Sequence, residues 1–442
     1  MSSQTLRARL SDRFRALRHR DFRLYFACQF VSIVGTWMQS IAQGWLLHRL
    51  DPAPLALGVL SFLQFLPALL LSMWAGVVAD RADKRRLLVI TQSVALVQAV
   101  VMALLVTTGA IRPWMIYSLA LVYGVFNAFD LPARQSFLVD IAGKDDLANA
   151  IALNSGAFNS ARIVGPAVAG VLVAWLPGVV AHLGIRGWFH TPLVGEAGCF
   201  WINALSYIAM LWGLARMRPG RRAPASATGT WEHLREGVRY AFADGSIRRL
   251  LLLLGFMSGF GWQYTTLLPV YAREILRANA DTYGALVSAF GLGSLFSTAV
   301  LTREHDRTDL RRNLFVGLGT AGVALAVFAW SRVLAVSLVA GFFAGFGLIL
   351  YVASTNTMLQ LALEDRLRGR VMSLYTLMLL GLAPIGALVV GFIAQHWSAP
   401  VATSFCAIVL LAGTLYVSSR IRLAAQRDAA TVTTADTSEP MA

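Results

Sequence analysis

The sequence predicts an all-α integral membrane protein with twelve transmembrane helices in two pseudo-symmetric halves of six. Three observations predict it: an apolar composition, one long polar break that divides the apolar runs evenly, and a charged motif that occurs twice. Of the 442 residues, 57% are hydrophobic and only 14% are charged, and the mean hydropathy is +0.61. A soluble domain carries about 25% charged residues, so the composition excludes an ordinary soluble globular protein.

The apolar residues gather in runs of about 20 or more, the length that a helix needs to cross a hydrocarbon core. A helix satisfies its own backbone polar groups where water is absent, so each run is expected to be helical. The twelve expected spans are 24–48, 56–79, 87–109, 114–133, 148–176, 196–215, 249–272, 281–302, 313–331, 333–358, 371–396 and 400–420.

One long polar segment follows the sixth run. Its first part is rich in Pro, Gly, Ala and Arg, which is typical of a linker. Its second part, WEHLREGVRYAF, places Leu234, Val238 and Phe242 at helical spacing and predicts a short interfacial helix. The expected domains are a basic cytoplasmic N-terminus at 1–20, six-helix bundles at 21–215 and 248–420, the linker with its helix at 216–247, and a disordered cytoplasmic tail at 421–442.

The net charge of +15 reflects 38 Lys and Arg, most of which lie in the segments expected on one side of the membrane. Basic residues next to spans favour the cytoplasmic side, so both termini are expected there. The first apolar run is too long for a signal-peptide core and is expected to stay uncleaved. Because the basic residues are spread over several segments, the pI of 10.5 indicates no nucleic-acid partner.

Several kinds of chemistry have no support in the sequence. Cys28, Cys199 and Cys406 lie in three separate spans without metal-ligand spacing, so we expect no disulfide, metal site or cofactor. No Walker A stretch, G-x-S-x-G or paired-histidine motif occurs, which disfavours an enzyme or an ATP-driven pump. Energy for transport is then expected from an ion gradient or from the gradient of the cargo.

The repeated motif is DRADKRR at 80–86 and DRTDLRR at 306–312. Each copy follows the second span of its half, which indicates an internal duplication. Many secondary transporters are built from such repeats, with the substrate site between the halves near the midplane. The competing interpretation, ordinary positive-inside charge, explains the Lys and Arg but not Asp80 and Asp306.

The stretch GVVADRADKRR resembles the signature of the major facilitator superfamily, G-x-x-x-D-R-x-G-R-[RK], with Asp83 in place of a glycine. The resemblance implies a cytoplasmic gate in which Asp80 docks at the start of the eleventh span, around Arg370 and Val371, where a helix N-terminus favours an anion. The candidate gate residues are Gly76, Asp80, Arg81, Asp83, Lys84, Arg85, Asp306, Arg307, Asp309 and Arg311.

By the repeat, Asp306 is expected to dock at the start of the fifth span, around 147–149. Both latches would close the cytoplasmic side when the cavity opens outward, and they would therefore bias a two-state equilibrium.

A second stretch, NSARIVGPAVAG in the fifth span, resembles the G-P-x-x-G-G pattern of drug-export branches of the superfamily. Gly165, Pro166 and Gly170 match it, and such residues permit close helix packing and bending. Further stretches, including TWMQSIAQGWLL, LPVYAREIL and LRGRVMSLY, are similar to the bacterial branch that includes the enterobactin exporter. The resemblance implies proton-driven export of a siderophore-like or drug-like molecule by a monomer in the bacterial cytoplasmic (inner) membrane.

Polar residues within the spans are candidates for the cavity lining. On the first span they share one helical face, which indicates either a cavity wall or hydrogen bonds between helices. In the superfamily the first, fourth, seventh and tenth spans line the cavity. The candidates are Gln29, Ser32, Thr36, Gln39, Gln43, Tyr123, Asn127, Trp262, Gln263, Thr266, Tyr351 and Asn356.

Asp130 and Arg162 are ionisable groups inside spans, where charge is costly and typically functional. Arg162 has three open roles: it holds an anionic cargo, pairs with a carboxylate in one conformation, or braces helices. Asp130 is the carboxylate nearest the cavity, although it lies toward the cytoplasmic end. Glu196, at the start of the sixth span, is the second candidate for proton coupling.

Three functions fit these observations. The leading hypothesis is a proton-coupled exporter of a small amphipathic molecule. The second is an importer or lipid facilitator of the same fold, and the third is a membrane scaffold or sensor that does not transport. A scaffold would tolerate bulky apolar substitutions at the polar positions, and an importer would raise the cellular content of its compound.

Overall fold

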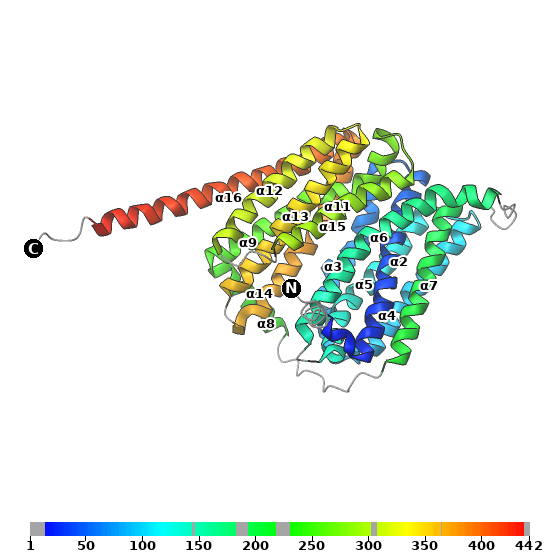
Figure 1. Ribbon diagram of the computed structural model, residues 1–442, viewed down its shortest axis with the longest axis horizontal. Coiled ribbons are helices and arrows are strands. Elements are labelled where there is room, and N and C mark those ends of the chain that lie inside the picture. Colours follow the sequence, from blue (N-terminus) through cyan, green and yellow to red (C-terminus); the bar gives the residue numbers. More distant parts are fainter. Residues whose placement is uncertain are drawn as a thin grey trace, which may run out of the picture.

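The protein is described here by a computed structural model that covers residues 14–143, 146–182, 193–217, 230–301, 307–363 and 365–436. Within these ranges the side chains of 73, 80, 230–234, 236–237, 307–308, 365–370 and 420–436 are not described. The described chain is helical throughout apart from short connections, and Figure 1 shows two helical bundles side by side.

The first bundle is the amino-terminal half. It consists of η1 (Arg15–Arg18), α2 (Arg20–Leu50), α3 (Pro54–Arg81), α4 (Lys84–Thr107), α5 (Pro113–Ala142), α6 (Leu147–His182) and α7 (Val194–Arg216). The carboxy-terminal half consists of α8 (Thr230–Ala243), α9 (Gly245–Phe256), η3 (Met257–Gly261), η4 (Gln263–Leu267), α10 (Leu268–Val270), η5 (Tyr271–Ile275), α11 (Ala280–Leu301), α12 (Arg307–Trp330), α13 (Leu334–Ala362), α14 (Asp365–Gly381), α15 (Ala383–His396) and α16 (Ala399–Asp436).

Ten helical stretches in the described chain are long and apolar enough to cross a membrane, and α14 with α15 supplies one of them. The expected first and seventh spans are not among the ten. The first, α2, is a continuous helix with three glutamines, and the seventh is interrupted. Large apolar side chains such as Leu205, Ile408 and Leu415 are more than 60% exposed, as expected of residues that face lipid. The predicted all-α membrane fold is confirmed.

The two ends of the bundle are named here by their loops. The basic end holds η1, the turn at 82–83, the start of α6 and α8. The opposite end holds the turns at 51–53, 108–112 and 276–279. Between the halves, α3 packs against α15 and α6 packs against α11.

Local sequence explains several helix starts. Proline stands in the first turn of α3 and α5, where its missing N–H costs nothing. Asp83, which replaces the signature glycine, caps α4: its side chain accepts a hydrogen bond from the Arg86 N–H at 3.0 Å. With a φ of −63°, the Asp83 position needs no glycine.

The seventh span is broken into π-helical and 3-10 turns between Met257 and Ile275. Its neighbour α15 approaches this break closely, because a Cβ on Gly386 would lie 1.6 Å from the carbonyl oxygen of Gly259. Interruptions of this kind inside a helix are frequent at functional sites.

Two segments outside the spans bear on the expected domains. The linker helix is present as α8. α16 continues past residue 420 to Asp436, and Figure 1 shows it projecting away from the bundles, whereas a disordered tail was expected from 421. The stretch IRLAAQRDAA is rich in good helix formers, which accounts for the extension.

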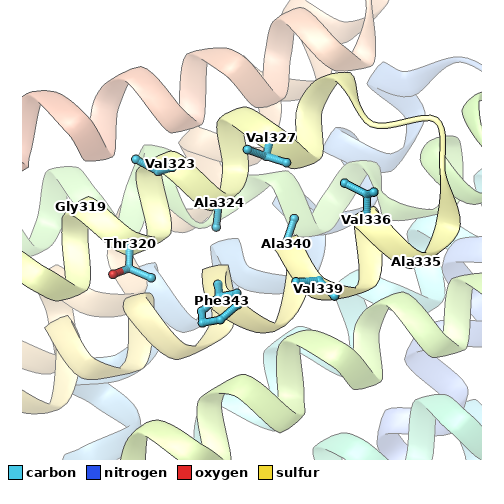
Figure 2. Close-up of a pocket in the computed structure, with 10 residues that line it drawn as sticks. All are labelled: Gly319, Thr320, Val323, Ala324, Val327, Ala335, Val336, Val339, Ala340 and Phe343. Atoms are coloured by element: carbon cyan, nitrogen blue, oxygen red, sulfur yellow. The ribbon is translucent and has the colours of Figure 1, made fainter.

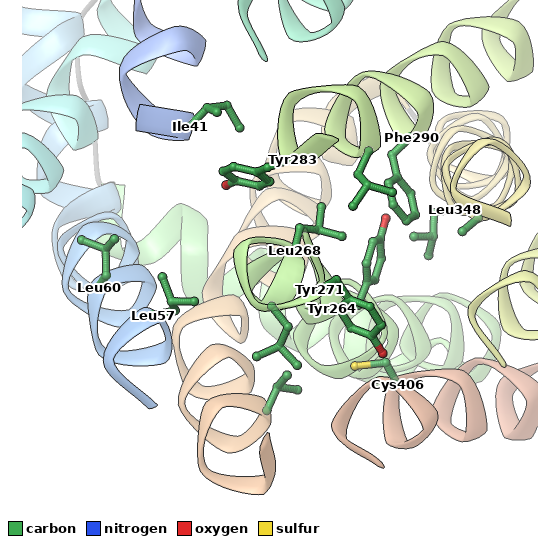
Figure 3. Close-up of a cluster of buried hydrophobic side chains, with 14 of the residues drawn as sticks. Ile41, Leu57, Leu60, Tyr264, Leu268, Tyr271, Tyr283, Phe290, Leu348 and Cys406 are labelled. Atoms are coloured by element: carbon green, nitrogen blue, oxygen red, sulfur yellow. The ribbon is translucent and has the colours of Figure 1, made fainter. Parts of the chain in front are cut away.

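The carboxy-terminal half has an aromatic core. Ring centroids lie 4.6 Å apart for Tyr264 and Phe290, 4.6 Å for Tyr271 and Phe328, and 5.6 Å for Phe290 and Phe328. Figure 3 shows part of this cluster beside Cys406. All three cysteines of the chain are free and buried.

Candidate functional site

Arg162 lies midway along α6, between the two halves. Its guanidinium carbon is 5.9 Å from the ring centroid of Trp37 on α2 and 5.3 Å from that of Trp262, which stands between η3 and η4. The Trp37 ring meets Phe158 edge-on, with centroids 6.0 Å apart. A cation attracted to the faces of two tryptophans, one from each half, therefore connects α6 to the broken seventh span.

No carboxylate in the described part of the chain neutralises the charge of Arg162. Within the described residues no carboxylate forms an ion pair with it, and no oxygen accepts a hydrogen bond from its guanidinium. The side chain is half-buried. Among the roles open from the sequence, pairing with a carboxylate does not occur in this conformation.

Small residues let α6 approach its neighbours at this level. A Cβ on Gly165 would lie 2.6 Å from the Trp37 Cβ, and one on Gly284 would lie 2.4 Å from the Pro166 oxygen. Gly170 faces α11 in the same way, since its Cβ would lie 2.8 Å from the Ala280 oxygen. The motif residues Gly165, Pro166 and Gly170 thus lie where α6 meets α2 and α11.

The polar face of α2 points into its own half. Gln39 donates to Gln98 Oε1 at 2.9 Å and accepts from Asn203 Nδ2 at 2.7 Å. The Thr36 and Tyr207 hydroxyls lie 3.1 Å apart. These contacts join α2 to α4 and α7, so Gln39 and Thr36 form hydrogen bonds between helices of the amino-terminal half. The other members of the stripe, Gln29, Ser32 and Gln43, are buried as well.

Asp130 is also bound within the amino-terminal half. Its Oδ1 accepts hydrogen bonds from Thr91 at 2.6 Å and Gln92 at 2.9 Å, and Arg134 donates to Oδ2. Arg134 was not among the residues predicted from the sequence. Its spacing of four residues after Asp130 on one helix is the signal that indicates such a pair.

At the opposite end, His48 of α2 contacts Glu274 and Arg273 of the other half. His48 Nε2 lies 3.1 Å from Glu274 Oε1, and Arg273 donates to the His48 carbonyl oxygen at 3.0 Å. Next to them, Arg49 donates to Glu196 Oε1 at 2.6 Å, and the Glu196 side chain is fully buried. The sequence identified Glu196 but neither His48 nor Glu274, because no periodicity on either helix links residues that far apart.

At the basic end, the motif after α3 ties helices of one half together. Lys84 donates to Asp140 Oδ2 at 2.8 Å, which links α4 to α5. Arg85 donates to the carbonyl oxygens of Leu214 at 2.7 Å and Ala215 at 2.9 Å, at the negative end of the α7 dipole.

The other expected gate residues whose side chains are described lie outside that network. Arg81 and Arg311 are exposed, Gly76 is half-buried, and Asp309 pairs with Arg312 at 3.2 Å. Asp306 and the side chains of Asp80, Arg307 and Arg370 lie outside the described residues.

The start of α6, where Asp306 was expected to dock, is occupied by η1. The Ala16 N–H donates to Asn149 Oδ1 at 3.0 Å. His19 lies 2.8 Å from Asp146 Oδ2, and Arg15 donates to Asp146 Oδ1. The hydrogen bonds from His19 and Arg15 lower the pKa of the Asp146 carboxyl below its usual range.

The remaining cavity candidates are dispersed. Tyr123, Asn127 and Thr266 are half-buried. Gln263 donates to the Ser258 oxygen at 3.3 Å, and Asn356 accepts from Gln360 on its own helix. Tyr351 is buried in its own half, and its hydroxyl has no hydrogen-bond partner in the described structure.

A groove of about 750 Å³ lies between α12 and α13 (Figure 2), and Arg162 is not among its lining residues. Thr320 is its one hydroxyl-bearing lining residue. The groove therefore offers no charged group to a ligand.

A family model described as transmembrane secretion effector, of the major facilitator type, matches residues 11–442. The chain belongs to this family. The chain is 26% identical over 375 residues to the staphyloferrin A transporter of Staphylococcus aureus, with 84% of this chain and 89% of that protein covered. It is 25% identical over 374 residues to the multidrug efflux pump Tap of Mycolicibacterium fortuitum, with 82% and 86% covered.

The fold of this chain is also found among solved structures. A bacterial homolog of the human lysosomal transporter Spinster, in an inward-facing and occupied conformation, superimposes with a TM-score of 0.66 at 13% identity, covering 92% of this chain and 95% of that one. The family and these relatives are transporters and not enzymes. The prediction of a multi-pass membrane transporter of the major facilitator superfamily is therefore confirmed.

Proposed function

We propose that the protein is a secondary active exporter of a small amphipathic molecule, siderophore-like or drug-like, that works by alternating access. Protons are the proposed coupling ion, and the monomer is the proposed working unit. The proposed location is the bacterial inner membrane, with the basic end and both termini in the cytoplasm.

The position of the contacts between the halves carries this proposal. From the level of Arg162 to the opposite end, the halves are joined by the Ser288 hydroxyl, which donates to the Ile163 oxygen at 3.0 Å, and by the contacts of His48 with Glu274 and Arg273. Gly58 and Gly391 bring α3 and α15 together near the same end. Such an arrangement suits a conformation closed at the opposite end, which is one of the two states that alternating access requires.

Export is favoured over import by the relatives, since one is named an efflux pump and the family description is a secretion effector. For proton coupling, Asp130 and Glu196 are the proposed carboxylates. Each holds an arginine through an ion pair, so protonation of either carboxylate would release that arginine.

Transport by purified protein in liposomes tests the function. With an imposed pH gradient, movement of a catecholate siderophore, a macrolide and a cationic dye is followed. We expect gradient-dependent movement of at least one compound. Movement at the same rate with and without the pH gradient would contradict proton coupling.

Two variants locate the proton site, Asp130→Asn and Glu196→Gln. The variant that still moves the compound down its own gradient, but no longer responds to the pH gradient, identifies the coupling carboxylate. Failure of the unmodified protein to move any of the three compounds in either direction would count against the exporter.

A further inference from the structure

We propose that Arg162, with Trp37 and Trp262, binds a carboxylate on the cargo, so that the transported molecule is an organic anion with an aromatic or apolar body. This inference rests on the proposed function and names the substrate class for the centre of the molecule.

Arg162 is a charged side chain without a carboxylate partner in the described structure. Removing a guanidinium from water within a membrane span is costly, and the cost is ordinarily offset by a carboxylate partner. Arg162 has no such partner in the described structure, whereas Arg134 and Arg49 in the same half each have one. A bound anion would supply at Arg162 what Asp130 supplies at Arg134.

The guanidinium of Arg162 lies beside two tryptophan rings. The two tryptophan rings interact with the guanidinium at 5.9 Å and 5.3 Å, and neither takes a hydrogen bond from it. The N–H groups therefore stay available for a planar, bidentate acceptor. One guanidinium matches one carboxylate, whereas a phosphate dianion would call for further cations, and no other Lys or Arg is described in ring contact with these tryptophans.

Aromatic side chains lie next to the Arg162 cation. Phe158 extends the aromatic surface from Trp37, and Trp262 stands in the broken part of the seventh span. These rings offer an aromatic or apolar body contact area next to the charged group.

A cargo molecule would reach Arg162 from the basic end. Ser155 and Asn159 precede Arg162 on one face of α6, with Ser155 exposed and Asn159 half-buried. These two polar side chains mark a route along α6 from the basic end to the guanidinium. Trp37 and Trp262 belong to different halves, so the cargo would contact both of the parts that move relative to each other.

Two xanthene dyes of similar shape and opposite charge test the inference. Fluorescein carries a carboxylate and is an anion, whereas rhodamine 6G carries an ester and is a cation. Binding of each dye to the purified full-length protein in lipid nanodiscs is measured by fluorescence anisotropy. For fluorescein we expect Arg162→Gln to raise the Kd about tenfold or more and Arg162→Lys to raise it less. Binding of rhodamine 6G should be unchanged or tighter in Arg162→Gln.

The matched control is Arg239→Gln, which removes an exposed arginine of α8, and it should change neither Kd. Thermal unfolding of each variant separates a binding effect from misfolding. Equal losses for both dyes, an unchanged fluorescein Kd in Arg162→Gln, or no fluorescein binding by the unmodified protein would each overturn the inference.

The outcome can be told apart from that of the exporter proposal, since dye binding needs neither a gradient nor a direction. Gradient-driven movement of a compound without Arg162-dependent fluorescein binding would leave the exporter standing and remove the anion site. Arg162-dependent binding without gradient-driven movement of any compound would do the reverse.

Discussion

The two halves of the protein share a topology but are held together differently inside. The amino-terminal half has a buried polar interior, in which Asp130, Arg134, Gln39 and Asn203 form directional bonds between helices. The carboxy-terminal half has an aromatic interior around Phe328 and a span broken into short turns. Hydrogen bonds fix one arrangement of donors and acceptors, whereas apolar rings slide past one another at lower cost.

This difference assigns different tasks to the halves. A bundle fixed by hydrogen bonds is expected to keep its internal arrangement, and one packed by rings and interrupted helices is the part expected to change its internal shape. The cation between them, Arg162, is anchored on the hydrogen-bonded side and reaches the broken seventh span on the other.

The largest effect is expected from Asp130→Ala. It leaves Arg134 buried without its carboxylate, and breaking a buried pair on one side costs about 3–5 kcal/mol. Thermal or detergent unfolding of the purified protein measures the loss. The double variant Asp130→Ala, Arg134→Ala should recover part of it, and a cost near zero would show that the polar interior does not hold this half together.

A smaller loss is expected from Phe328→Ala in the other half. The change removes ring contacts with Tyr271 and Phe290 and leaves a cavity. In water such a truncation costs about 3–5 kcal/mol, but lipid solvates separated helices, so about 2–3 kcal/mol is expected here. Phe328→Leu is the volume control in the same unfolding assay. If Phe328→Ala costs more than Asp130→Ala, the ranking of the two interiors is reversed.

Gln39→Leu should cost about 0.6–1 kcal/mol, the typical value for hydrogen bonds between membrane helices. It removes one donated and one accepted bond. Gln43→Leu is the matched control, because the amide nitrogen of Gln43 has no partner in the described structure, and this change should be neutral or stabilising. Unfolding free energies that are equal for the two variants would contradict the assignment of the α2 stripe to helix packing.

The smallest effect concerns η1 and is confined to acid. The pKa of Asp146 is lowered in the folded protein, so its contribution is complete above the unfolded pKa of about 3.9 and is lost as the pH falls through the lower folded value. Hydrogen exchange of the η1 amides should therefore be constant from pH 7 to about 4 after correction for intrinsic rates, and it should increase below that. In Asp146→Asn the increase should be absent, and an unchanged acid response would exclude this carboxyl as its source.

The sequence was sufficient for the fold, because long apolar runs are local signals, and it singled out Arg162 as a charge inside a span. It could not show that Trp37 and Trp262 flank Arg162, since that depends on how two halves pack. It left the α2 stripe open between a cavity and helix packing for the same reason, and only the partners Gln98 and Asn203 distinguish these. The contact of His48 with Glu274 could not be predicted from the sequence, because no pattern in either segment indicates that these two residues meet.

The burial of Cys28, Cys199 and Cys406 has a practical consequence. Thiols with little contact with solvent react slowly with maleimides and oxidants, so the native chain behaves as if it were cysteine-free toward labelling reagents. A single cysteine introduced into each half at the basic end would then take up a spin label or fluorophore without removal of the native three. The distance between the two labels would report directly on how far the halves separate.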